Sequence, residues 1–124
     1  MGVSVKIAEL IGQTILRIDG RVGDEAMTLV MTDAKEYRFA HSRDCCEYVR
    51  INDICGDLGH LVGAPLLMAE ESTNSEDSTE IIMSPDSFTW TFYKFATIKG
   101  YVTIRWLGES NGYYSERVQL ERTP

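Results

Sequence analysis

SFTWTFYKFATIKGYVTIRWLGESNGYYSERVQL, residues 87–120, is the stretch that decides the fold. It contains three β-rich runs, at residues 88–93, 101–107 and 113–120, separated by two turn signals. Lys99-Gly100 and Asn111-Gly112 suit tight hairpins, because glycine accepts the positive φ angle that a two-residue loop requires. The stretch therefore predicts a three-stranded antiparallel meander.

Alternation within the first two runs predicts which side chains are buried, because successive residues of a strand point to opposite faces. In the first run the expected buried face consists of Phe88, Trp90 and Phe92, and the expected outer face of Thr89, Thr91 and Tyr93. In the second run the expected buried residues are Val102, Ile104 and Trp106, and the expected outer residues are Tyr101, Thr103 and Arg105.

The rest of the chain also favours strands. Further strands are expected at residues 14–18, 26–31, 35–40, 48–51 and 66–69, a short helical turn or strand start at 8–13, and a helical turn from residue 53 to about residue 62. Residues 70–80 contain only Ser, Thr, Asn and acidic residues and are expected to form an exposed loop. The prediction is a single domain, residues 1–124, with a mainly β (α+β) fold. We expect an antiparallel, twisted or partly closed sheet of about six to seven strands with one or two short helices.

The net charge of the chain limits the classes of ligand and partner that the protein is expected to bind. Nineteen acidic and 12 basic residues give a formal net charge of −7. Duplex nucleic acids are bound mainly by neutralising phosphates, so this class of ligand is not expected. The net charge is still compatible with binding of a small anion by a few clustered cations, or with binding to a basic site on a partner protein. Residues 1–13 do not have the pattern of a signal peptide, so none is expected, and the sequence has no apolar run of membrane-spanning length. Three cysteines without an expected export signal predict reduced thiols in a cytoplasmic protein.

Three kinds of site chemistry are conceivable in the middle of the chain, and the sequence disfavours each of them. Zinc-ligating residue types occur at His41, Cys45, Cys46, Cys55 and His60. No CxxC pair is present, and adjacent cysteines in an extended segment point to opposite faces. Buried structural thiols are therefore the expected reading, and no metal site is predicted.

Acidic neighbours also oppose nucleophilic catalysis by these thiols. Asp44 and Glu47 flank Cys45-Cys46 and would raise the thiol pKa. Asp53 and Asp57 could act as paired carboxylates, but capping of a helical turn explains them better. No catalytic residue and no cofactor are predicted.

The most credible site is a polar and aromatic face on the C-terminal meander. Arginine matches a phosphate bidentately, and tyrosine rings can stack on a base. The predicted ligand-binding residues are Arg105, Arg117, Tyr93, Tyr113, Tyr114, Lys94, Thr91 and Thr103, with Arg50 in reserve. The same composition also fits the wet outer face of ordinary strands, since Thr and Tyr are good strand residues.

Four segments resemble a family of small uncharacterised bacteriophage and prophage proteins. They are Asp44-Cys45-Cys46-Glu47, residues 53–58 (DICGDL), residues 67–71 (LMAEE) and residues 89–116 (TWTFYKFATIKGYVTIRWLGESNGYYSE). The resemblance extends from about Leu10 to Leu120. It implies a phage accessory protein in the cytosol of a host bacterium, and proteins of this kind often act against host defence.

Three hypotheses follow from the residues and the resemblance together. The first is a non-enzymatic, homo-oligomeric binding protein that sequesters a small nucleotide second messenger of the host. The second is an acidic inhibitor that binds a host defence protein or mimics a nucleic acid. The third is a small hydrolase of a nucleotide signal.

Overall fold

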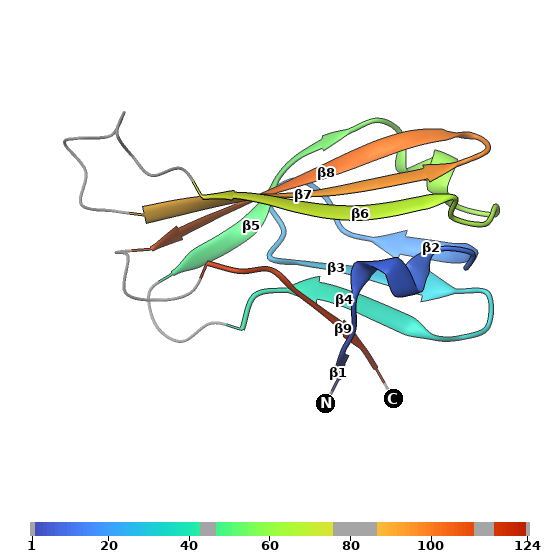
Figure 1. The fold of residues 1–124 in the computed structure, drawn as a ribbon, viewed down its shortest axis with the longest axis horizontal. Coiled ribbons are helices and arrows are strands. Elements are labelled where there is room, and N and C mark those ends of the chain that lie inside the picture. Colours follow the sequence, from blue (N-terminus) through green and yellow to red (C-terminus); the bar gives the residue numbers. More distant parts are fainter. Residues whose placement is uncertain (1, 43–46, 76–86, 111–115, 124) are drawn as a thin grey trace.

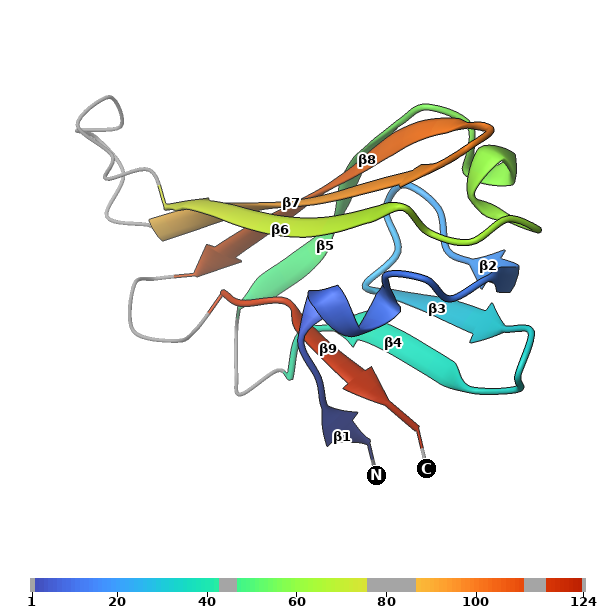
Figure 2. The same cartoon turned by 45° about the vertical axis from the view of Figure 1, so that its right-hand side comes forward.

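The chain folds into two antiparallel β-sheets that stack face to face, with the hydrophobic core between them (Figure 1; Figure 2). The computed structural model describes residues 2–42, 47–75, 87–110 and 116–123. The five-stranded sheet has the order β1-β9-β4-β3-β2, and the four-stranded sheet has the order β5-β8-β7-β6. Both orders are open, so neither sheet closes on itself.

The elements have the following bounds. The five-stranded sheet consists of β1 (Val3–Ser4), β2 (Ile15–Asp19), β3 (Ala26–Met31), β4 (Glu36–Ala40) and β9 (Gln119–Arg122). The four-stranded sheet consists of β5 (Tyr48–Cys55), β6 (Met68–Ser75), β7 (Ser87–Thr97) and β8 (Gly100–Ser110). Two single turns of 3-10 helix, η1 (Ile7–Leu10) and η2 (Leu58–Leu61), are the helical elements of the described residues.

The mainly antiparallel β prediction is confirmed, and the first hairpin forms, but its predicted turn at Lys99-Gly100 is wrong by one residue: Gly100 is the first residue of β8 and has no positive φ. β7 and β8 are joined by Ile98-Lys99, with Thr97 opposite Gly100 at the start of the ladder. β6 continues the sheet beyond β7, and β5 pairs with the other side of β8. The pairing of β5 with β8 shifts between Ile51 and Asp53, which leaves Asn52 in a β-bulge.

Aromatic rings from both sheets meet in the core. Phe39 of β4 packs edge-on against Tyr93 of β7, with 4.7 Å between ring centroids, and against Phe95 at 6.2 Å. All three side chains are at most 1% exposed. Edge-to-face pairs of this kind add about 0.5–1.5 kcal/mol each beyond the area that they bury.

The predicted faces of β8 are confirmed, but the predicted faces of β7 are wrong. Val102, Ile104 and Trp106 are buried as expected, whereas Thr91, Tyr93 and Phe95 point into the core of the molecule. Phe88, Trp90 and Phe92 are only partly buried and lie on the opposite side of the sheet. The error arose because both faces of β7 carry aromatic residues, so residue type alone does not choose between them.

The third run of the predicted meander also behaves differently. β9 leaves the hairpin and pairs with β4 and β1 in the other sheet. The Asn111-Gly112 turn lies outside the described residues. A strong local turn signal favoured a neighbouring partner, whereas the observed pairing is long-range.

The middle of the chain contains more strand than predicted. Asp53 lies within β5 and caps no helix. Asp57 is a cap as expected, since its Oδ1 accepts a hydrogen bond from the Gly59 N–H at 2.9 Å. Glu70 to Ser75 belong to β6, and residues 76–80 of the predicted loop lie outside the described part of the chain. The described residues thus form nine strands in two sheets, in place of one partly closed sheet of six to seven strands.

A buried histidine–glutamate pair links the two sheets. His41 directly follows β4, and Glu47 directly precedes β5. The His41 Nε2 lies 2.9 Å from Glu47 Oε2, and its Nδ1 lies 2.6 Å from the carbonyl oxygen of Arg117. The two side chains are 5% and 0% exposed. Because a carbonyl oxygen only accepts hydrogen bonds, Nδ1 donates, and the second nitrogen shares a proton with the carboxylate.

We expect this pair to be strongly coupled in stability. His41→Ala or Glu47→Ala alone should lower the free energy of unfolding by about 3–5 kcal/mol, because each removes one member of a buried ionisable pair and leaves the other without that contact. The double variant should cost less than the sum, by about 0.5–3 kcal/mol. Urea unfolding of the four proteins gives the coupling energy directly, and strictly additive losses would contradict the linkage.

Gly108 of β8 should not tolerate a side chain. A Cβ atom there would lie 2.6 Å from the Glu116 carbonyl oxygen and 3.3 Å from the Val49 side chain. Overpacking of this kind typically costs about 1–3 kcal/mol, so Gly108→Ala should lower the urea midpoint. Gly59→Ala is the matched control, because its Cβ would meet only the Asp57 side chain, at 3.1 Å. Equal losses in the two variants would contradict close packing at Gly108.

Candidate functional site

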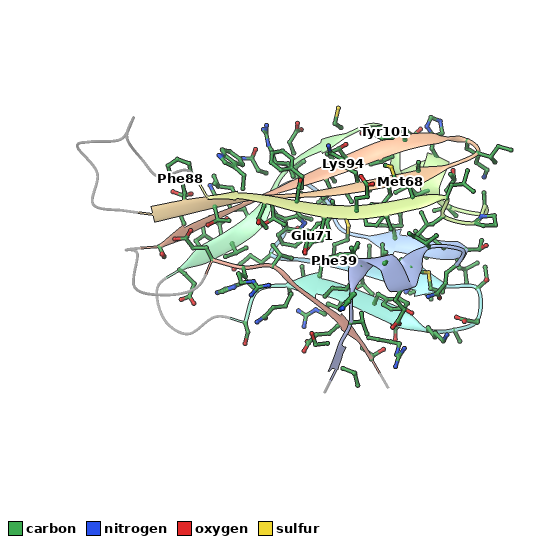
Figure 3. All side chains as sticks on the ribbon, in the orientation of Figure 1. Phe39, Met68, Glu71, Phe88, Lys94 and Tyr101 are labelled. Carbon is green, nitrogen blue, oxygen red and sulfur yellow. The ribbon has the colours of Figure 1, made fainter. Side chains whose placement is uncertain are left out.

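The outward side of the four-stranded sheet, called the outer face below, carries an unusual set of side chains. Aromatic residues stand on it in three of the four strands: Tyr48 on β5, Tyr101 on β8, and Phe88, Trp90 and Phe92 on β7. Figure 3 shows Phe88, Lys94 and Tyr101 on the side of the sheet that faces away from the five-stranded sheet. Large exposed aromatic groups that are gathered on one surface usually mark an interaction site.

Arg105 is the central cation of the outer face. Its Nε and Nη2 donate hydrogen bonds to Asn52 Oδ1 at 3.0 and 2.7 Å. Its guanidinium also lies over the Trp90 ring, 4.9 Å from the centroid. The bulge in β5 brings Asn52 into this position, since one extra residue re-aims a side chain.

The two groups that hold Arg105 are uncharged. Asn52 and the Trp90 ring are both neutral, and no carboxylate of the described residues lies within ion-pair distance of Arg105. Lys94, on the neighbouring strand, likewise has no ion pair with the described residues. A carboxylate is nevertheless directly opposite each cation in the ladder, Asp53 opposite Arg105 and Glu70 opposite Lys94. An anion can therefore contact both cations, and it would share the face with these two acidic residues.

Arg50 differs from Arg105 in this respect. Its guanidinium lies 4.4 Å from the centroid of the Tyr48 ring, and it forms an ion pair with Glu109. The carboxylate neutralises the cation locally. Arg50 therefore contributes packing contacts at one edge of the outer face and is a poorer binding group for an anion than Arg105.

A shallow apolar hollow lies beside these cations. Phe88, Trp90, Leu107 and Glu109 line it, and its volume is about 240 Å³. The Phe88 and Trp90 rings are edge to face, with 6.4 Å between centroids. The hollow offers aromatic surface for a flat ring or an apolar side chain.

The structure brings together only part of the predicted ligand-binding set. Arg105, Lys94 and Thr103 share the outer face, where Lys94 is opposite Thr103 in the ladder. Thr91 and Tyr93 point inward, so the prediction that they share a face with Arg105 is wrong. Tyr113 and Tyr114 lie outside the described residues, and Arg117 lies away from the outer face.

Sequence reasoning missed Phe88, Trp90, Phe92 and Asn52 as members of this surface. The three aromatic residues of β7 were assigned to the core, although the hairpin itself held the correct signal. In the ladder Val102 is opposite Phe95, and Ile104 is opposite Tyr93. Because directly opposite residues share a face, a buried Val102 requires the odd-numbered residues of β7 to be buried as well. For Asn52 no such signal existed, since the bulge is not marked in the sequence.

Arg117 and Tyr93 come near each other at the edge between the two sheets. The Tyr93 hydroxyl is buried, and Glu71 is directly opposite Tyr93 in the ladder. Burial, and secondarily hydrogen bonding to the Glu71 carboxylate and its negative charge, hold the pKa of this hydroxyl well above its ordinary value, with Arg117 acting in the opposite direction.

The residues weighed as metal ligands or nucleophiles are dispersed. His41 is engaged with Glu47, and His60 belongs to η2. Cys55 is exposed at the end of β5, so the expectation of a buried thiol is wrong for this residue. Within the described ranges, no three His, Cys, Asp or Glu side chains form a group that could hold a metal ion. Cys45 and Cys46 lie outside those ranges.

The described residues contain no helix with the length and apolar character that crossing a bilayer requires.

Comparison with known proteins places the chain in a family without assigning an activity. No curated protein and no solved structure matches it. Residues 8–120 match the family described as "Domain of unknown function (DUF7448)". The match covers the whole four-stranded sheet with its outer face, and it covers β2, β3, β4 and the first two residues of β9 in the other sheet. The chain therefore belongs to the DUF7448 family.

Proposed function

We propose that this protein is a non-enzymatic binding protein that captures a small nucleotide-type ligand on the outer face. One observation carries the proposal: Arg105 stands on an open sheet surface beside Trp90, held by a neutral amide and in no ion pair with the described residues. A guanidinium has five N–H donors, of which Asn52 takes two. Three donors are left for the oxygens of a phosphate.

The surroundings of Arg105 suit the rest of a nucleotide. Phe92 is directly opposite Arg105 in the ladder, and Trp90 lies under its guanidinium. Aromatic rings on the solvent side of an antiparallel sheet are a common platform for bases, worth about 1–3 kcal/mol per stacked base. Lys94, two residues further along β7 from Phe92, supplies a second cation. Phosphate and base can thus be held by adjacent groups of one surface.

The net charge of −7 does not oppose this local arrangement. Screening limits the reach of exposed charges to about 8 Å at physiological ionic strength. An anion at Arg105 therefore responds to Arg105, Lys94 and the nearest carboxylates more than to the rest of the surface. Duplex nucleic acid is different, because it would contact a wide area of an acidic protein.

The biological setting of the proposal comes from the resemblance to phage and prophage proteins. We propose that the captured nucleotide is a second messenger of bacterial defence and that the protein, acting as a homo-oligomer in the host cytosol, sequesters it. Binding without turnover would return the ligand chemically unchanged. The protein would then work stoichiometrically, so its abundance would set how much signal it removes.

The apolar hollow favours a second candidate, a host protein as the partner. Phe88, Trp90 and Leu107 can receive an apolar side chain, and aromatic and arginine residues are typical of interface hot spots. An inhibitor of a defence effector could bind in this way. A charge-driven protein complex should weaken with salt mainly through its association rate.

Thermal unfolding with a panel of cyclic and ADP-ribose-type nucleotides tests the proposal. At a hundredfold excess over Kd, a ligand specific for the folded state adds about 2.7 kcal/mol of stability. We expect a raised Tm for the unmodified chain and a lost or strongly reduced shift for Arg105→Gln. Arg38→Gln is the matched control and should keep the full shift, because Arg38 is an exposed residue of β4 in the other sheet.

Each other outcome has a defined meaning. An equal shift in Arg105→Gln would place the ligand away from the outer face. The absence of a shift with every nucleotide would favour the protein partner, to be sought by pull-down from the host. A shift with ligand that is recovered chemically altered would make the protein a hydrolase, the third hypothesis.

A further inference from the structure

The outer face has the side chains of a sheet face that is normally buried. In the segment 88–93 of β7 the outward residues are Phe88, Trp90 and Phe92. The inward positions of the same segment include Thr89 and Thr91. The larger apolar groups thus lie on the solvent side. Strands with apolar residues on both faces are typical of sheets that are covered on both faces, so this composition indicates a further layer.

The described residues provide no such layer. They form two sheets, and the four-stranded sheet is one of the two outermost layers (Figure 1). Tyr48 and Tyr101 are 44% and 55% exposed, and Phe88, Trp90 and Phe92 are only partly buried. Aromatic surface that is gathered in this way and rimmed by polar groups marks a protein interaction site. A partner molecule can supply the cover that the described part of the chain does not.

The charges of the outer face balance, although the chain as a whole has a formal net charge of −7. Basic and acidic residues occur on it in equal number: Arg50, Lys94 and Arg105, and Asp53, Glu70 and Glu109. Asp53 is directly opposite Arg105 in the ladder. Glu70 is likewise directly opposite Lys94. A strongly basic or acidic partner gains little from such a neutral surface, whereas two copies of the chain can approach through it without like-charge repulsion.

The size and the twist of the sheet also suit a second copy. β7 and β8 have 11 residues each, and β5 and β6 have 8 residues each. With a rise of about 3.3 Å per residue and about 4.8 Å between strands, the face covers on the order of 600 Å². Specific interfaces bury about 600–1,000 Å² on each partner, so the area is sufficient. Two copies of one sheet have the same right-handed twist, which allows face-to-face packing with the strands about 30° apart.

We infer that two copies of the chain form a two-fold symmetric dimer through their outer faces. A two-fold interface uses the same surface of both copies, so that surface must complement itself. A neutral and aromatic sheet face meets this requirement. In the dimer Phe88, Trp90 and Phe92 lose their contact with water, which favours association through the hydrophobic effect.

The dimer does not depend on the proposed capture of a nucleotide. It identifies the interface of the homo-oligomer, and it forms without added ligand. A nucleotide bound at Arg105 would lie between the two copies, because Arg105 belongs to the same face. Exclusion of water from that space would strengthen the contact between the guanidinium and a phosphate.

Sedimentation equilibrium of the full chain tests the inference. We expect a mass that rises with protein concentration from that of one chain to that of two. Tyr48→Glu and Tyr101→Glu should each weaken association at least tenfold, because each places an uncompensated negative charge on both copies of the interface. Both tyrosines are exposed, so the variants should stay folded. Leu16→Glu is the matched control and should associate normally, because Leu16 is an exposed residue of β2 in the other sheet.

The fluorescence of Trp90 reports on the same surface without a change of its charge. The chain has two tryptophans, and Trp106 is 1% exposed in the core. Dilution below the dissociation constant of the dimer should expose Trp90 to water and shift the emission to longer wavelength. Trp90→Phe should lack this shift, because Trp106 stays buried in the monomer.

Three results would overturn the inference. They are the mass of a single chain up to millimolar concentration, equal weakening in Leu16→Glu and the two tyrosine variants, and a dimer that dissociates without a change in Trp90 emission. The first would favour a different protein as the partner of the outer face. A monomer that binds a nucleotide would keep the proposed function and remove the dimer, and a dimer that binds no nucleotide would do the reverse.

Discussion

The contact of Phe39 with Tyr93 and Phe95 is the interaction on which the rest of the structure depends. It joins the two sheets at their centre and fixes which side of β7 is buried. Once Tyr93 and Phe95 point inward, strand alternation places Trp90, Phe92 and Lys94 on the outer face. The aromatic platform and the cation beside it are thus consequences of core packing. No further structural feature is needed to place these side chains on the solvent side of the sheet.

Local signals predicted the hairpin, the faces of β8 and the cap at Asp57, because each depends on residues close in sequence. The faces of β7 were also within reach: the ladder places Val102 opposite Phe95, so one correct assignment implies the other. Composition misled because Trp90 and Phe92 are as apolar as the residues that are buried. The pairing of β9 with β4 was beyond reach, since its partner residues are about 80 positions apart and carry no local mark. Of the candidate site, Arg105 was found by its residue type, whereas Asn52 depends on a bulge that has no sequence signature.

Two arginines of the same sheet show how an acidic chain can keep cations available. Arg50 lies over Tyr48 and is paired with Glu109, so its charge is compensated on the protein itself. Arg105 lies over Trp90 but is oriented by the neutral oxygen of Asn52. Both guanidinium groups are held in place by a ring and an acceptor, and they differ in whether the acceptor carries charge. A neutral acceptor such as Asn52 fixes the orientation of the guanidinium without adding a negative charge that would repel an anion. A preorganised phosphate contact requires this combination.

Because β7 serves a different purpose on each face, its register must be held firmly. A slip by one residue would bring Phe92 or Lys94 to the buried position of Tyr93. The two-residue turn at Ile98-Lys99 fixes the ladder at one end. At the other end the Glu116 carboxylate accepts a hydrogen bond from the Thr89 hydroxyl of β7, at 2.7 Å, and another from the Ser110 hydroxyl of β8. Gly108 has no side chain, so the backbone of Glu116 can approach β8 closely. A buried carboxylate that binds one hydroxyl from each strand is satisfied only in a single register. The glycine and the glutamate therefore protect the outer face, although neither residue lies on it.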